Sequence, residues 1–209
     1  MASTITHLAI AKQVKESLNI TIKNEYEYYL GAIAPDLSKQ IGETKDASHF
    51  LYNTINSIPN TDLFVKRYPL FLYNSFDLGY FVHIYTDKMW IENFLPKLVN
   101  ENTVTLLDGT TLKTSQEEIN NLIYSDYTNL NTQIINEYNL DLSIFYEELK
   151  PPKTEIKEIP VNMLDILINK IGIIIENSNE EKTYTFDIHS IKNFINETAD
   201  RIVKEIEKY

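Results

Sequence analysis

The sequence predicts an all-α protein, a multi-helix bundle with a small hairpin or ordered loop inserted between its helices. Three observations lead to this fold class. Apolar residues recur at helical spacing in several long segments, the 209 residues include only 7 Pro and 5 Gly, and 43% of them are hydrophobic. Such a chain can bury a core of its own. We expect residues 1–209 to form a single domain.

The first predicted helix carries a histidine. A hydroxyl at Ser3 or Thr4 can cap this helix, because the side-chain oxygen accepts a hydrogen bond from a free backbone N–H group. Apolar residues then recur at helical spacing as far as Asn19. His7 is therefore expected about one turn into the helix.

A second, aromatic-rich helix is predicted over residues 25–34. Proline disfavours helical dihedral angles in the residue before it, so Pro35 should end this helix. Asp36 is then expected on a turn or loop, where its carboxylate is free to point inward. A short helix should follow over residues 46–55 and carry His49.

Another short helix is expected over residues 61–67, ahead of the most informative segment. Residues 75–99 are apolar on nearly every side, which is typical of a helix buried in the middle of a bundle. This predicted helix carries His83 and Asp87. Because four positions separate them, their side chains project from the same face and can reach a common ion.

The C-terminal half begins with a change of pattern. β-Branched residues on both sides of Asp108 and Gly109 favour a small hairpin or ordered loop. Three further helices and a proline-containing extended connector are expected after it. The helices are predicted over residues 115–138, 161–176 and 187–208, and the connector over residues 148–160.

Composition narrows both the chemistry and the partners. The chain has no Cys, so a metal ion would be held by His nitrogen and carboxylate oxygen. A net charge of −11 argues against general binding to nucleic acids or anionic membranes. The apolar stretch 163–175 is too short and too interrupted to be a transmembrane segment, and no secretion leader is visible. A cytoplasmic location is therefore expected.

Carboxylates in apolar surroundings indicate a shared metal site. Asp87 lies in an otherwise apolar helix, where an ionised carboxylate is costly unless a cation or hydrogen-bond donors compensate it. Asp36 lies in the apolar string GAIAPDL, so its carboxylate needs the same compensation. Three of the four histidines, His7, His49 and His83, fall in segments that can be neighbours in a bundle. The alternative interpretation is a core histidine at position 83 beside a solvated Asp87.

Four motifs in order carry a family resemblance. The chain resembles the bacterial zinc-dependent phospholipase C family, in a short form, through the strings THLAIA, YLGAIAPDLS, SHF and LGYFVHIYTDKMW. This resemblance covers residues 1–95, with a weaker likeness in YSDYTNLN at residues 124–131. It implies an all-α bundle, a Zn²⁺ or similar divalent cofactor, and hydrolysis of phosphoesters.

The resemblance also implies roles for five residues. Asp36 is similar to the family's carboxylate beside the nucleophilic water, and His7 to its first-helix ligand. His49, His83 and Asp87 are similar to the centre of the metal site, with Asp87 able to bridge two ions. These five are the predicted metal ligands, and Asp36 is also the predicted catalytic residue.

Departures from the family pattern reduce the expected number of ions. Secreted members of the family have two further histidines and a glutamate, and Trp90 stands where the first of those histidines would be. Their processed amino terminus also ligates a metal, whereas six residues precede His7 here. We therefore expect one or two ions rather than three.

The remaining polar candidates lie in the C-terminal half. Asp126 and Asn131, in the weaker motif, are candidate metal or substrate contacts, with an ordinary helix surface as the alternative. His189 is expected in the first turn of the last helix without a metal role.

The sequence thus predicts a metal-dependent phosphoester hydrolase that acts on a small phosphoester or a phospholipid head group. No glycine-rich phosphate loop points elsewhere, and an HD-type phosphohydrolase would need an adjacent His-Asp pair, which the chain lacks. The alternative is a non-catalytic, metal-stabilised helical binding protein. A closed tetrahedral site would favour that alternative, whereas an open coordination position facing a cleft would favour catalysis.

Overall fold

Helices form most of the computed structural model, which describes residues 1–52, 57–146, 150–176, 178 and 181–209. The predicted all-α fold class is confirmed. The α-helices are α1 (Thr4–Ser17), α2 (Glu25–Gly31), α3 (Leu37–Gln40), α4 (Thr61–Arg67), α5 (Ser75–Met89), α6 (Leu95–Leu98), α7 (Gln116–Glu137), α8 (Asp165–Glu176) and α9 (Ile188–Ile206). Of the described helices, none is long and apolar enough to cross a membrane.

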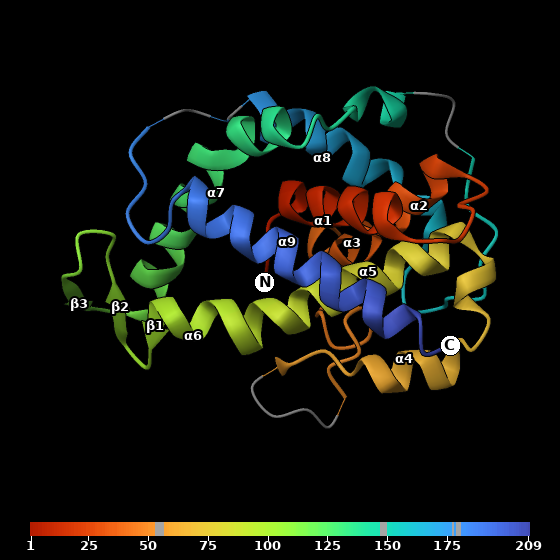
Figure 1. Cartoon of the computed structure of the whole chain (residues 1–209), viewed down its shortest axis with the longest axis horizontal. Helices are drawn as coiled ribbons and strands as arrows, with labels where there is room; N and C mark the ends of the chain where they lie inside the picture. Colours follow the sequence, from red (N-terminus) through yellow and green to blue (C-terminus); the bar gives the residue numbers. More distant parts are fainter. Residues whose placement is uncertain (53–56, 147–149, 177, 179–180) are drawn as a thin grey trace.

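Three short strands project from one end of the bundle, beside α6 (Figure 1). They form an antiparallel sheet in the order β1 (Val99–Asn100), β2 (Thr103–Thr105) and β3 (Thr111–Lys113). The turn between β2 and β3 contains Gly109 at a φ of +83°, a conformation that suits glycine. The predicted hairpin around Asp108 and Gly109 is therefore confirmed.

Helix α1 lies among the other helices and contacts α5, α7 and α9 (Figure 1). The hydroxyl of Ser3 caps it by accepting a hydrogen bond from the backbone N–H of Thr6, as predicted. Most of its residues between Ile5 and Val14 are buried, so α1 contributes core on more than one face. His7 is thereby placed in the interior.

Helix α5 is buried along nearly all of its length, which confirms the predicted central helix. It does not run on regularly to residue 99, because a π-helical turn, Trp90–Phe94, separates it from α6. The Trp90 ring is 1% exposed and its centroid lies 4.4 Å from that of Phe94 and 5.3 Å from that of Phe194. Trp90 is therefore part of an aromatic core cluster.

Helices α2 and α5 touch backbone to backbone at two glycines. A Cβ atom on Gly31 would lie 2.1 Å from the carbonyl oxygen of Phe76, and one on Gly79 would lie 2.0 Å from that of Tyr28. Both positions therefore require the absence of a side chain. This contact brings the end of α2 against the middle of α5, where His83 sits.

The segment between α2 and α4 differs from its prediction. Helix α2 ends at Gly31 and not at residue 34, but Asp36 lies past the helix end on a 3₁₀ turn, Ala34–Asp36, in agreement with the predicted turn or loop. Residues 46–50 form turns and not an α-helix, and residues 53–55 of the predicted helix lie outside the described residues. Tertiary contacts hold the turns instead, since the hydroxyl of Tyr80 donates to the carbonyl of Ser48 at 2.6 Å.

The extended connector packs along the beginning of α5. Residues 150–157 have no regular secondary structure, as predicted. The hydroxyl of Thr154 donates to the carboxylate of Asp77, and Asn74 donates to the carbonyl of Lys153 at 2.6 Å. Burial and the neighbouring charge of Glu155 raise the pKa of Asp77 to about 6.

Substitution of Gly79 by alanine is predicted to destabilise the fold, because the new methyl group would overlap the backbone of α2. We expect a loss of about 1 to 3 kcal/mol in the free energy of unfolding, measured by urea denaturation. Gly172→Ala is the control, because Gly172 lies in α8 and a Cβ added there would be 3.8 Å from the hydroxyl oxygen of Tyr146, an ordinary van der Waals contact. That variant should gain about 0.5 to 1 kcal/mol from helix propensity. Equal effects of the two substitutions would contradict the close approach.

Substitution of Asp77 by asparagine is predicted to stabilise the protein increasingly as the pH rises towards about 6, with the full effect above that pH. A carboxyl whose pKa is raised in the folded state stabilises the fold below its unfolded pKa and loses this contribution as the pH rises through its folded pKa. Asp77→Asn should therefore raise the free energy of unfolding by about 1 to 3 kcal/mol near neutral pH and by little in acid. Thermal melts across this pH range measure it, with Asp62→Asn, an exposed residue of the first turn of α4, as control.

Candidate metal centre

The structure brings five predicted ligands together from separate segments. Potential ligand atoms of His7, His83 and Asp87 all lie within 4.8 Å of one another, and the same holds for Asp36, His49 and His83. His7 comes from α1, Asp36 from the 3₁₀ turn, His49 from the turns after α3, and the other two from α5. The i, i+4 spacing on α5 thus does place His83 and Asp87 on one face.

The carboxylate of Asp87 lies at the centre of the cluster, with no exposed surface. Its Oδ1 lies 3.4 Å from Nε2 of His7 and accepts a hydrogen bond of 2.9 Å from the backbone N–H of Ala2. Its Oδ2 lies 3.4 Å from Nε2 of His49 and 3.5 Å from Nε2 of His83. The two oxygens therefore face two different sets of imidazoles.

Two of the imidazoles are held with Nε2 toward Asp87. The Nδ1 of His83 donates to the carbonyl of Ala32 at 2.8 Å, which leaves the lone pair on Nε2. The Nδ1 of His49 lies 2.8 Å from the hydroxyl of Ser48, and that hydroxyl lies 3.0 Å from the hydroxyl of Ser38. The two Nε2 atoms are 3.3 Å apart.

Unpartnered buried atoms show that the cluster suits a cation. Among the residues that the structure describes, both ring nitrogens of His7 and Oδ2 of Asp87 are buried without a hydrogen-bond partner. Such atoms are costly, because they have given up water without replacing its hydrogen bonds. Imidazole nitrogen and carboxylate oxygen are ligands that Zn²⁺ accepts, so an ion would satisfy them.

The protonation states also favour metal binding. Burial, followed by the neighbouring charge of His83, lowers the pKa of His7 to about 4, and burial lowers the pKa of His49 as well. Neutral imidazoles keep a lone pair for an ion. Burial opposes ionisation of Asp87, but its contacts with His7 and His83 outweigh burial and hold the pKa of this carboxyl well below its usual range.

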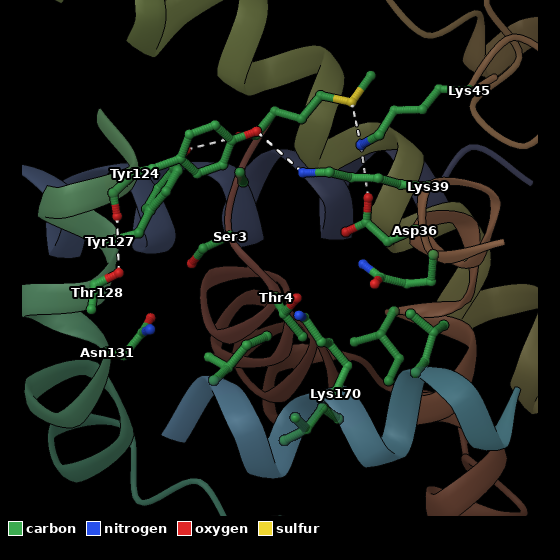
Figure 2. A pocket seen from close by; sticks show the side chains of 17 residues that line it. Ser3, Thr4, Asp36, Lys39, Lys45, Tyr124, Tyr127, Thr128, Asn131 and Lys170 are labelled. Atoms are coloured by element: carbon green, nitrogen blue, oxygen red, sulfur yellow. Dashed lines mark hydrogen bonds and ion pairs between the residues drawn. The ribbon is translucent and has the colours of Figure 1, made fainter. Parts of the chain in front are cut away.

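Asp36 belongs to the buried cluster and also lines a cavity of about 280 Å³, whose lining side chains are shown in Figure 2. Its side chain is 18% exposed, and Oδ1 lies 2.7 Å from Nζ of Lys45 and 3.7 Å from Nε2 of His49. Burial raises its pKa, but contacts with His49, His83 and Lys45 together hold that pKa well below its usual range. Asp36 is therefore the ionised member of the cluster that reaches the cavity.

The other sequence candidates are not in the cluster. Asp126 is buried, and its carboxylate accepts hydrogen bonds from the backbone N–H groups of Tyr184 and Thr185 at 2.7 and 2.6 Å. This ties α7 to the segment ahead of α9. Asn131 lines the cavity, 4% exposed, and its Oδ1 has no hydrogen-bond partner in the described part of the chain. His189 is exposed on α9, as expected.

Sequence reasoning missed two groups that border the cluster. One is the backbone N–H of Ala2, because nothing in a linear pattern pairs residue 2 with Asp87. The other is Lys45, whose Nζ holds Oδ1 of Asp36. Its place in the polar string GETKDAS gave it the appearance of a surface residue. Only its position four residues before His49 could have drawn attention to it.

Comparison with known proteins agrees with this geometry. The family described as zinc dependent phospholipase C matches residues 6–90, a range that contains all five clustered side chains. The resemblance predicted from the motifs is confirmed over these residues. No curated protein and no solved structure matches the chain.

Metal analysis provides the direct test of the cluster. The purified protein should carry one or two equivalents of a divalent ion, and His83→Ala should lose most of it, because a methyl group cannot replace an imidazole ligand. His7→Ala should lose about one equivalent if Oδ1 and Oδ2 of Asp87 serve different ions. His189→Ala is the matched control and should keep the full content. Unchanged metal content in His83→Ala, with a native circular dichroism spectrum, would refute the site.

Proposed function

We propose that the chain is a metal-dependent phosphoester hydrolase, as its match to the zinc dependent phospholipase C family over residues 6–90 suggests. The observation that carries this proposal is a buried set of unpartnered ligand atoms joined to a cavity through Asp36. His7, Asp36, His49, His83 and Asp87 would hold one or two Zn²⁺ or similar divalent ions. We further propose that residues 1–209 act as a single domain in the cytoplasm.

The residues divide into two roles on this proposal. The three imidazoles and Asp87 would hold the metal ion, which when bound would supply Lewis acidity to a phosphoryl oxygen and lower the pKa of water. Asp36 orients the attacking water and accepts its proton, because it is ionised and faces the cavity. Lys45 keeps Asp36 in place through a hydrogen bond to Oδ1.

The substrate is a small phosphoester or a phospholipid head group. A cavity of about 280 Å³ lies near the lower end of the volumes typical of small-molecule sites. A nucleic acid is a poor candidate, because the chain carries a net charge of −11. Asn131 is a candidate substrate contact, since its amide lines the cavity and its Oδ1 is free of partners among described residues.

One observation favours the alternative of a non-catalytic, metal-stabilised binding protein. His7, His49, His83 and Asp87 are all at most 1% exposed, as in a closed structural site. The partial exposure of Asp36 distinguishes the two functions, because it gives one edge of the cluster access to a ligand. We therefore place hydrolysis first.

Asparagine substitution separates the proposed roles of the two aspartates. Asp36→Asn should reduce turnover of a chromogenic phosphate ester by about a hundredfold or more, with metal content largely retained, because a neutral amide cannot accept the proton. Asp87→Asn should lose metal and turnover together. Asp46→Asn, an exposed neighbour in the same turns, is the matched control and should retain both. Metal-loaded wild type that is stabilised by the ion yet inactive on all esters would establish the non-catalytic alternative.

A further inference from the structure

The cavity beside Asp36 is lined by lysines from three separate segments. Lys39 comes from α3, Lys45 from the segment before the turns, and Lys170 from α8, and all three line this one space. Figure 2 shows them together with Asp36 around the cavity. Asp36 is the single carboxylate among the described residues that line it.

Two of these lysines lack an acidic partner. Across the residues that the structure describes, Lys39 and Lys170 form no ion pair, whereas Lys45 is bound to Asp36. The ammonium group of Lys39 lies 3.5 Å from the hydroxyl of Tyr124 and 5.1 Å from the centroid of its ring. In a chain with a net charge of −11, unpaired cations at one concave site create a local field opposite to that of the whole molecule.

The rest of the lining is apolar on the α8 side. Leu167, Ile171 and Ile174 line the cavity from α8, and Ile33 lines it from just before the 3₁₀ turn that carries Asp36. Lys39 and Lys170 are exposed side chains, so water and salt screen their attraction for an anion, and the apolar wall excludes water on one side of the cavity only. The cavity therefore combines cationic groups with a surface for a short hydrocarbon portion.

We propose that this cavity binds a second anionic group of the substrate, with Lys39 and Lys170 as its specificity-determining residues. The favoured ligands are phosphoesters that carry a carboxylate or a further phosphate beyond the scissile phosphate. This inference rests on the proposed function, because Asp36 joins the cavity to the cluster where the scissile phosphate would lie. Esters with a quaternary ammonium head group are disfavoured, since like charges repel.

A matched pair of soluble ligands tests the subsite by binding rather than turnover. 3-Phosphoglycerate and glycerol 3-phosphate share a phosphate monoester and differ by a carboxylate in place of a hydroxymethyl group. Isothermal titration calorimetry on the metal-loaded protein should show tighter binding of 3-phosphoglycerate, with phosphocholine the weakest of the three. In the double variant Lys39→Gln/Lys170→Gln this preference should fall by about five- to tenfold. The preference should also weaken as salt is added.

The control variant is Lys113→Gln, which removes the same charge from the exposed strand β3, away from the cavity. It should keep the wild-type preference. If Lys113→Gln loses as much selectivity as the double variant, the effect belongs to the overall charge and the subsite is refuted. Retained selectivity in the double variant also refutes it.

A second arm distinguishes a free phosphoester from a lipid head group. Binding of the protein to lipid vesicles is measured by sedimentation. One set of vesicles contains phosphatidylcholine alone, and in the other set half of the lipid is phosphatidylserine, which presents a carboxylate on the membrane. Binding to the second vesicles that depends on Lys39 and Lys170, without selectivity for 3-phosphoglycerate, assigns the subsite to a lipid. Selectivity in solution assigns it to a free ester, and no preference in either arm overturns the proposal. A protein that binds selectively yet hydrolyses no ester refutes the hydrolase proposal instead.

Discussion

The backbone contact between α2 and α5 is the constraint on which the site depends. Gly31 and Gly79 let the two helices approach closer than any pair of side chains would allow. The carbonyl of Ala32, one residue after α2, then reaches Nδ1 of His83 and fixes which ring nitrogen faces the cluster. The 3₁₀ turn that carries Asp36 begins at Ala34, three residues after α2 ends. Packing and ligand orientation therefore have a common origin.

The burial of Asp87 explains the shape of the cluster around it. An ionised carboxylate with no exposed surface has lost its hydration and needs hydrogen-bond donors or positive charge in its place. The direct neighbours of Asp87 are three imidazoles and the backbone N–H of Ala2. These contacts provide only part of that compensation, because Oδ2 of Asp87 remains without a hydrogen-bond partner among the described residues. The depth of the cluster also explains why Asp36, at its edge, is the member placed to meet a ligand.

The net charge of this protein and the charge of the lysines around its cavity have opposite signs. The chain as a whole is acidic, yet Lys39, Lys45 and Lys170 gather at one cavity. The negative net charge repels a polyanion at long range, although salt screens this repulsion over about 10 Å. The lysines at the cavity attract a small anion at short range, so the two effects are compatible. On the proposed function, a small anionic ester would therefore be favoured over a nucleic acid.

Much of the fold was predictable, because strong helical periodicity is a local property. The bounds of α1, α4 and α7, the buried character of α5 and the hairpin after α6 all follow from spacing, capping residues and turn chemistry. The predicted helix over 46–55 was wrong in its described part, since long-range contacts such as Tyr80 to Ser48 hold that segment as turns. The π-helical turn at Trp90 was also missed, because aromatic packing with distant residues accompanies it.

By itself, the sequence determined the fold class and pointed to five candidate metal ligands, because scarce His and Asp among apolar residues can be recognised without a structure. Only the tertiary structure decided that Asp126 bonds to the chain at residues 184 and 185, outside the cluster. It alone placed Lys39 and Lys170 at one cavity and Ala2 against Asp87. These contacts join residues that are far apart in the chain. They depend on side-chain packing and on the desolvation of polar groups, which cannot be read from a local sequence pattern.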